Sequence, residues 1–241
     1  MKEGRVQAIK RELQAKRTIE KDDNMMNLSK RILRLFVGYF VCAVGMVMTM
    51  NANLGFAPWD VLHQGISNMT GLTIGKANIV LGFLIILIDI YLGENIGWGT
   101  VFNMIFIGIF IDLIMINNLI PIFNSFLPSL TILLLGVLTL GYGVFLYLSA
   151  GFGAGPRDGL MVGLTKKTGK SVRFVKNTVE ILALSLGYLI GGLPGIGTAI
   201  LAISGGYFFQ FAFKTVNFNV AEVEHRLIID DINYIKERFK R

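Results

Sequence analysis

The stretches Asn53-Leu-Gly-Phe-Ala-Pro-Trp-Asp-Val-Leu-His-Gln-Gly65 and Gly151-Phe-Gly-Ala-Gly-Pro-Arg-Asp-Gly-Leu-Met-Val-Gly163 lie 98 positions apart and share the pattern Gly-x-x-Pro-x-Asp-x-Leu-x-x-Gly. Glycine permits a sharp turn, and proline suits the first position of the helix that follows. Gly71 and Gly169 are suitable helix ends. Each stretch therefore predicts a helix of about twelve residues, too short to cross a bilayer. Such a helix either lies at the membrane interface or enters the bilayer as a half-helix. The residues that define this half-helix motif are Gly55, Pro58 and Gly65, with their counterparts Gly153, Pro156 and Gly163.

The same offset relates the two halves of the chain along most of their length. Residues 33–114 align with residues 131–212 without a gap, and 19 of the 82 aligned positions are identical. Apolar composition alone would not place a proline, an aspartate, a Thr-Gly pair and a Gly-x-Gly-Thr turn in one frame. We interpret the pattern as an internal duplication.

The composition is that of a membrane protein. Hydrophobic residues make up 53% of the chain and charged residues only 16%, whereas soluble domains are about 25% charged. The net charge is +7, but the basic residues flank apolar segments, so we expect no nucleic-acid partner. Cys42 is the single cysteine, and the chain has only two histidines. We therefore expect no disulfide within the chain, no metal site and no cofactor.

Six apolar stretches approach or reach the length that a membrane span requires. In a bilayer such segments must be helical, because unpaired backbone groups are too costly there. The predicted spans are Leu33–Met50, Ala77–Leu92, Thr100–Ile116, Leu127–Ala150, Val175–Gly191 and Thr198–Phe213. Each copy of the duplication then has three spans, an odd number, so the second copy is inserted upside down.

The predicted fold is an all-α polytopic membrane protein with about six transmembrane helices. They form two inverted three-helix repeats, each with a short half-helix after its first span. Residues 1–31 are predicted to form a basic cytoplasmic N-terminal helix or tail, and residues 215–241 a cytoplasmic C-terminal tail. The first membrane repeat covers residues 32–117 and the second covers residues 127–214. Inverted repeats are characteristic of transporters, whose sites lie between the repeats.

The distribution of cations predicts the orientation, because cytoplasmic loops of membrane proteins are rich in lysine and arginine. Residues 1–31 carry nine Lys and Arg against five Asp and Glu, and residues 151–174 carry five cations. The segment 51–76 holds only one cation, Lys76, and residues 117–126 hold no charged residue. Both termini are therefore expected in the cytoplasm.

Asp60 and Asp158 fall in the first turn of the two short helices, and two roles are open for them. Each carboxylate could bond backbone N–H groups at its own helix start and complement the helix dipole. Alternatively, the pair could face a shared cavity and bind a cation, a proton or a polar solute, because ionisable groups at membrane depth are functional candidates.

Three further polar residues are candidates for solute or ion binding. Arg157 occupies the position of Trp59 in the other half, and it is either an anchor at the membrane surface or a partner of a carboxylate or an anionic solute. Glu180 either faces a cavity or forms an ion pair with a nearby cation. His63 has no polar counterpart in the second half. Asp89, near the end of its span, is expected to be solvated.

The stretches Leu54–Gly65 and Gly153–Met161, with the Thr-Gly-Lys-Ser-Val-Arg sequence that follows the second, resemble the YczE/YyaS/YitT-like integral membrane proteins of bacteria. The resemblance covers roughly residues 30–235. It implies a multi-span helical fold and a location in the bacterial inner membrane, and it implies little about chemistry.

The leading functional hypothesis is a secondary transporter or facilitator of a small solute, and not an enzyme. Its partners would be the lipid bilayer, the unknown solute and, in addition, a second copy or another membrane protein. One alternative is an accessory or scaffold protein for a membrane-associated partner. The other is an intramembrane enzyme, which would need the carboxylates of Asp60 and Asp158 within a few ångströms of each other.

Overall fold

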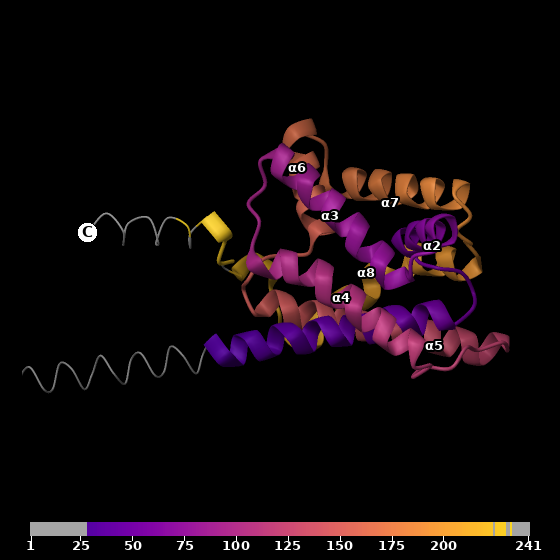
Figure 1. The fold of residues 1–241 in the computed structure, drawn as a ribbon. Helices are drawn as coiled ribbons and strands as arrows, with labels where there is room; N and C mark the ends of the chain where they lie inside the picture. Colours follow the sequence, from indigo (N-terminus) through magenta and orange to yellow (C-terminus); the bar gives the residue numbers. More distant parts are fainter. Residues whose placement is uncertain (1–27, 224, 230–231, 233–241) are drawn as a thin grey trace, which may run out of the picture.

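The computed structural model describes residues 28–223, 225–229 and 232. Most of the predicted N-terminal helix or tail, residues 1–27, lies outside these residues. The helices of the described part are a first helix through Leu28–Asn51, called the N-terminal span below, followed by α2 (Pro58–Thr70), α3 (Ile74–Leu92), α4 (Trp98–Ile116), α5 (Phe126–Ser149), α6 (Pro156–Thr168), α7 (Val172–Leu189) and α8 (Ile196–Thr215), and a short 3-10 helix η1 (Val220–Glu222). The described part of the chain thus has the predicted all-helical fold (Figure 1).

Five helices are long and apolar enough to cross a membrane: the N-terminal span, α3, α4, α5 and α8. They correspond to five of the six predicted spans. The sixth, α7, is 18 residues long and is not among the five. It contains Arg173, Lys176 and Glu180 in its first half, and these charges lower its hydropathy.

The two predicted short helices are present with the expected ends. Helices α2 and α6 each have 13 residues and begin at Pro58 and Pro156. They end at Gly71 and Gly169, whose φ angles of 73° and 66° lie in the left-handed region that favours glycine. The predicted turn and stop signals of the half-helix motif are therefore confirmed.

The N-terminal span and α5 lie side by side in opposite directions (Figure 1). A Cβ atom added at Gly45 would lie 2.6 Å from the backbone nitrogen of Leu140, and one added at Gly143 would lie 2.6 Å from that of Cys42. Gly45 and Gly143 are equivalent positions of the duplication, and so are Cys42 and Leu140. The same contact is therefore made twice, with the roles of the two halves exchanged. Glycine is required at both positions because any side chain would separate the helices.

Each short helix packs against a long helix of the other half. Helix α2 packs against α7, and α6 packs against α3. A Cβ at Gly65 would lie 2.4 Å from Cγ1 of Ile190, and one at Gly163 would lie 3.0 Å from Cβ of Leu92. These two glycines of the motif thus permit close packing between the halves.

The turns before the short helices also exchange backbone hydrogen bonds between the halves. The N–H of Gly99 donates to the carbonyl of Phe152 at 2.8 Å, and the N–H of Gly197 donates to the carbonyl of Leu54 at 2.6 Å. These two bonds join equivalent positions in exchanged roles. The neighbouring Gly55 and Gly153 have φ angles of 111° and 121°, which only glycine adopts without strain.

The halves differ in how their last two helices meet. In the first half, α3 packs against α4, where Gly75 and Gly108 approach so closely that a Cβ on Gly108 would lie 2.5 Å from the carbonyl oxygen of Gly75. At the equivalent Gly206 of α8, an added Cβ would have no atom within 4 Å. The counterpart of Gly75 is Arg173, whose side chain is exposed.

Part of the predicted C-terminal tail folds back onto the bundle. The backbone N–H of Arg226 donates to the carbonyl of Gly151 at 2.9 Å, and that of Ile228 donates to Ile96 at 3.0 Å. Nδ1 of His225 accepts the N–H of Gly153 at 3.2 Å. Burial lowers the pKa of His225 below its ordinary value, so the neutral ring that this hydrogen bond requires is favoured.

Candidate functional site

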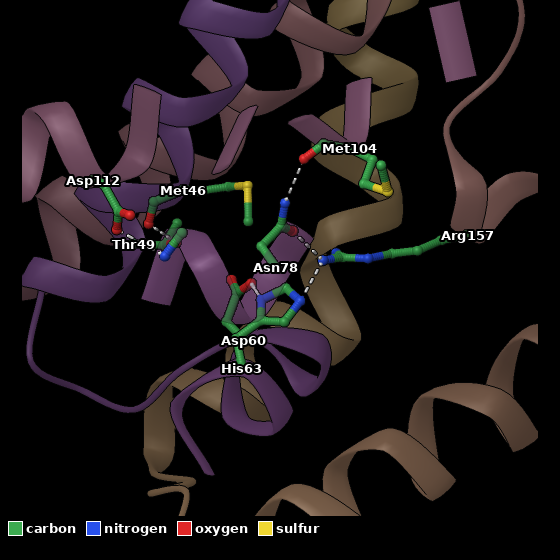
Figure 2. A network of polar contacts seen from close by, with 9 residues as sticks. Met46, Thr49, Asp60, His63, Asn78, Met104, Asp112 and Arg157 are labelled. Carbon is green, nitrogen blue, oxygen red and sulfur yellow. Dashed lines mark hydrogen bonds and ion pairs between the residues drawn. The ribbon is translucent and has the colours of Figure 1, made fainter. Parts of the chain in front are cut away.

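Arg157, the second residue of α6, extends its side chain into the other half of the molecule (Figure 2). Its Nη2 lies 3.0 Å from Nε2 of His63 and donates to Oδ1 of Asn78 at 3.2 Å. His63 lies on α2 and Asn78 on α3. Arg157 therefore joins three helices, and both of its hydrogen-bond partners come from the first half of the chain.

The guanidinium of Arg157 also stacks on an aromatic ring. Its Cζ lies 5.0 Å from the centre of the Trp59 ring, within the range of a cation–π interaction. Within the described residues, no ion pair joins Arg157 to a carboxylate. The guanidinium is thus held by neutral groups, and its positive charge is not cancelled by direct contact.

His63 is fully enclosed, with 1% of its surface exposed. An arginine can only donate hydrogen bonds, so the bond from Arg157 requires a lone pair on Nε2 and puts the ring proton on Nδ1. Nδ1 lies 3.2 Å from Oδ1 of Asp60, although the two atoms are not aligned as a hydrogen bond. Asp60, His63 and Arg157 therefore form a chain in which the imidazole separates the carboxylate from the guanidinium.

Asp158 lies beside this chain, at the start of α6. Its Oδ2 accepts a hydrogen bond from the Tyr147 hydroxyl at 3.3 Å. The Asp60 side chain, in contrast, lies beside the His63 ring (Figure 2).

The pair Asp60 and Asp158 does not form a direct contact. No hydrogen bond or ion pair joins the two carboxylates in the described part of the chain, but both act electrostatically on Arg157. Asp158 and Arg157 are only partly buried, so part of their surface stays accessible. The two carboxylates flank one cation from opposite halves of the molecule.

Glu180 of α7 lies at the edge of this group. Its Oε1 is 3.9 Å from Nζ of Lys176, one turn earlier on the same helix, which is one of the ion pairs that the sequence suggested. It also interacts electrostatically with Arg157. We therefore place Glu180 outside the direct contacts of the site.

Two residues of the site were not among the sequence candidates. Asn78 and Tyr147 lie within two of the predicted spans, Ala77–Leu92 and Leu127–Ala150. Neither has a polar counterpart of the same type in the other half, because Lys176 and Thr49 occupy the equivalent positions. Their partners lie in distant parts of the sequence, so no local pattern could identify them.

One expectation is wrong. Asp89, which the sequence placed in solvent near the end of its span, has 0% of its surface exposed. Helix α6 packs against α3 at this point and covers the carboxyl group. Asp112, in contrast, has a structural role, because it accepts hydrogen bonds from the Thr73 hydroxyl and the Gly75 N–H at the start of α3.

The cluster around Arg157 combines charged side chains with neutral hydrogen-bonding groups. Among the described residues, no group of three or more His, Cys, Asp or Glu side chains is placed to hold a metal ion. The cluster consists of one cation, two carboxylates, an imidazole, an amide and a phenol. Together they provide hydrogen-bond donors, hydrogen-bond acceptors and groups of opposite charge among otherwise apolar helices.

Comparisons with known proteins identify the family. The chain matches the family of unknown function DUF6198 over residues 29–214. It is 36% identical over 192 residues to the "Uncharacterized membrane protein YczE" of Bacillus subtilis (strain 168), covering 77% of this chain and 88% of that protein. It is 34% identical over 187 residues to an uncharacterized protein of Haemophilus influenzae, covering 78% of this chain and 85% of that protein. The "Uncharacterized protein YyaS" of Bacillus subtilis is 28% identical to this chain over 174 residues, covering 70% of this chain and 86% of that protein.

No solved structure matches the chain. The family match extends from the start of the N-terminal span to the last turn of α8, so it includes every residue of the site. The chain therefore belongs to the DUF6198 family and is a YczE-like helical membrane protein.

Proposed function

We propose that the chain is a secondary transporter or facilitator of a small polar solute across the bacterial inner membrane, without enzymatic activity. The observation that carries this proposal is the position of Arg157, which reaches from the half-helix of one half to His63 and Asn78 of the other. A charged side chain in the interior of a membrane bundle is costly and is typically retained for function.

The proposal includes an inverted repeat of residues 32–117 and 127–214. Support comes from the antiparallel contact of the N-terminal span with α5, in which equivalent residues exchange partners. The hydrogen bonds from Gly99 to Phe152 and from Gly197 to Leu54 likewise join equivalent positions with the roles of the two halves exchanged. A two-fold axis that relates antiparallel membrane helices must be perpendicular to them, and therefore lies in the membrane plane.

We further propose that α7 is the sixth span and that both termini are cytoplasmic. The charges of α7 lie in its first half, where Arg173 and Lys176 are exposed and would reach the cytoplasmic surface. The rest of the helix presents apolar side chains outward, as lipid contact requires. They include Ile181, Leu182, Leu186 and Leu189, each more than half exposed.

The site would bind the solute at the junction of the two halves. Arg157 has five N–H donors, and its described hydrogen bonds involve only one of its nitrogens, Nη2. The remaining donors could bind a carboxylate, a phosphate or another acceptor group. Helices α2 and α6 also direct the partial positive charge of their N-termini toward the turns at the junction, as half-helices of known transporters do.

Solute uptake by proteoliposomes tests the transport proposal. The full chain would be reconstituted and offered a panel of labelled amino acids, organic acids, sugars and inorganic anions under an imposed ion gradient. We expect at least one solute to accumulate, and we expect Arg157→Gln, Asp60→Asn and Asp158→Asn each to reduce its uptake about tenfold or more, the equivalent of 1.4 kcal/mol.

Lys167→Gln is the matched control, because it removes an exposed cation from the same helix as Arg157. Its uptake should equal that of the unmodified chain. If neither aspartate variant changed the uptake or efflux of any solute, the result would count decisively against the site.

Cysteine accessibility tests the inverted repeat separately. Single cysteines near Trp59 and near Lys166, in a chain with Cys42→Ala, would be labelled by a membrane-impermeant maleimide in intact cells and in inverted vesicles. The two positions should react from opposite sides of the membrane. Reaction of both from one side would exclude an inverted arrangement.

A further inference from the structure

Asp89 lies in the last turn of α3, outside the cluster around Arg157. None of its surface is exposed, and both oxygens of its carboxyl group lack a hydrogen-bond partner among the described residues. Buried polar groups are nearly always hydrogen-bonded. A carboxyl group with two unpaired oxygens therefore needs an explanation other than its contribution to packing.

The carboxyl group is covered by α6. A Cβ atom added at Gly159 would lie 2.7 Å from Oδ2 of Asp89, so the oxygen approaches the backbone of α6 at the residue next to Asp158. Helix α3 belongs to the first half and α6 to the second. Asp89 thus lies in the contact between the two halves that involves the half-helix carrying Arg157.

The charged groups around Asp89 do not neutralise a negative charge. The titratable groups that act on it electrostatically are Glu94, in the loop after α3, and Asp158 of α6, and both are acids. The nearby cation Lys166 is paired with Glu94 at 2.9 Å. A carboxylate at position 89 would therefore be buried without a counter-ion and beside two further acids.

The other half has no carboxyl group at the equivalent position. The counterpart of Asp89 is Gly187 of α7, which contacts α2 in the way that Asp89 contacts α6. A Cβ at Gly187 would lie 2.5 Å from the backbone nitrogen of Leu62. Direct backbone contact is sufficient there, so the carboxyl group at position 89 is an addition found in one half only.

We propose that Asp89 is a proton-binding site, and that its protonation holds α3 and α6 together. An unpaired charge buried in this contact costs several kcal/mol, whereas the neutral acid costs far less. The carboxyl group therefore carries a proton while α6 covers it. When the proton leaves to water, the carboxylate must reach solvent, and α3 and α6 must separate. Binding of the proton forms one O–H bond on the carboxyl group. Release breaks that bond and transfers the proton to water, and no other covalent bond changes.

This inference rests on the proposed transport function, because it identifies the proton as the ion whose binding is coupled to movement between the halves. Helix α6 carries both Arg157 and the backbone that covers Asp89. Separation of α3 from α6 would therefore also draw Arg157 away from Asn78, which lies on α3. Proton release and rearrangement of the solute site would occur in one motion.

Infrared difference spectroscopy tests the proton site without a solute. The full chain in lipid nanodiscs would be compared with Asp89→Asn, an isostere of the protonated acid, at a series of pH values. We expect the unmodified chain to show a carbonyl stretch of a protonated carboxylic acid that Asp89→Asn lacks. Asp112→Asn is the matched control on α4, because the side chain of Asp112 accepts two hydrogen bonds, and this variant should leave the acid band of Asp89 in place.

Hydrogen exchange of the α6 amides tests the coupling to movement. If one proton leaves on opening, the opening equilibrium rises roughly tenfold for each pH unit, after correction for the intrinsic exchange rate. The slope should disappear in Asp89→Asn and also in Asp89→Gly, which places the counterpart residue there. The second variant guards against an effect of the new amide.

Two results would overturn the proposal. One is an acid band that is identical in the unmodified chain and in Asp89→Asn at every pH. The other is an α6 exchange slope that both variants retain. Neither result depends on finding a solute, so failure of the proton site is distinguishable from failure of the transport proposal.

Discussion

Trp59 and Arg157 are equivalent residues of the two halves, and they contact each other: the Cζ atom of Arg157 lies 5.0 Å from the centre of the Trp59 ring. In the proposed inverted repeat, two equivalent positions that touch lie close to the two-fold axis. The junction of the halves is therefore built around an aromatic ring and a guanidinium, and the duplicated sequence has diverged at the position where divergence can make the two sides chemically different.

Replacement of Arg157 by lysine should destabilise the protein. Lysine cannot reproduce the planar contact with Trp59 or the two bonds that Nη2 makes to His63 and Asn78. We expect the free energy of unfolding, measured in mixed micelles, to fall by about 1–3 kcal/mol, because the acceptors of His63 or Asn78 lose their donor. Lys166→Gln should change it by less than about 0.5 kcal/mol, and an equal loss in both variants would contradict the assignment.

Two equivalent glycines should respond in opposite ways to alanine. In Gly108→Ala the new Cβ would lie 2.5 Å from the backbone oxygen of Gly75, so α3 and α4 must move apart and we expect a loss of about 1–3 kcal/mol in the free energy of unfolding. In Gly206→Ala the Cβ meets nothing within 4 Å. That variant should be neutral or more stable by up to about 1 kcal/mol, because alanine favours the helix. Equal effects would contradict the asymmetry of the halves.

Removal of the hydroxyl should be more costly at Thr198 than at Thr100. The Thr198 hydroxyl donates to the carbonyl of Phe56 at 2.6 Å and accepts the N–H of Gly195 at 2.9 Å, whereas that of Thr100 accepts the N–H of Gly97 at 3.3 Å. We expect Thr198→Val to reduce the free energy of unfolding by about 1–3 kcal/mol, and Thr100→Val to reduce it by less. Chemical unfolding of both variants under the same conditions gives the comparison.

Acidification should release the segment that contains His225. Its Nδ1 accepts the N–H of Gly153, and burial lowers the pKa of the folded ring below the ordinary value. Because the pKa of His225 is lower in the folded chain than in the unfolded chain, docking is complete above about pH 6.5. Docking is lost as the pH falls through that value and then through the folded pKa, because protonation of Nδ1 removes the hydrogen-bond acceptor.

Hydrogen exchange of the Gly153 amide measures this release. Its protection should fall between about pH 7 and about pH 5 in the unmodified chain. His225→Asn keeps an acceptor oxygen but does not titrate in this range, so its protection should not depend on pH there. A decrease of the same size in both chains would show that His225 is not the titrating group.

The helices and their ends follow from local patterns. The Pro-led turns at Pro58 and Pro156, the stops at Gly71 and Gly169 and five of the apolar spans were predictable, because hydropathy and helix capping depend on residues a few positions apart. The candidates Asp60, Asp158 and Arg157 were selected through the repeat, and His63 was selected as a polar residue of the same motif.

The partners of those residues came from the folded chain alone. Arg157 meets Asn78 across 79 residues of sequence and His63 across 94, and Asp89 is covered by a helix of the opposite half. Whether a polar residue near the end of a span meets water, lipid or another helix depends on how all of the helices pack. That packing is the sum of many small contacts between distant segments, so periodicity and spacing within one segment do not reveal it.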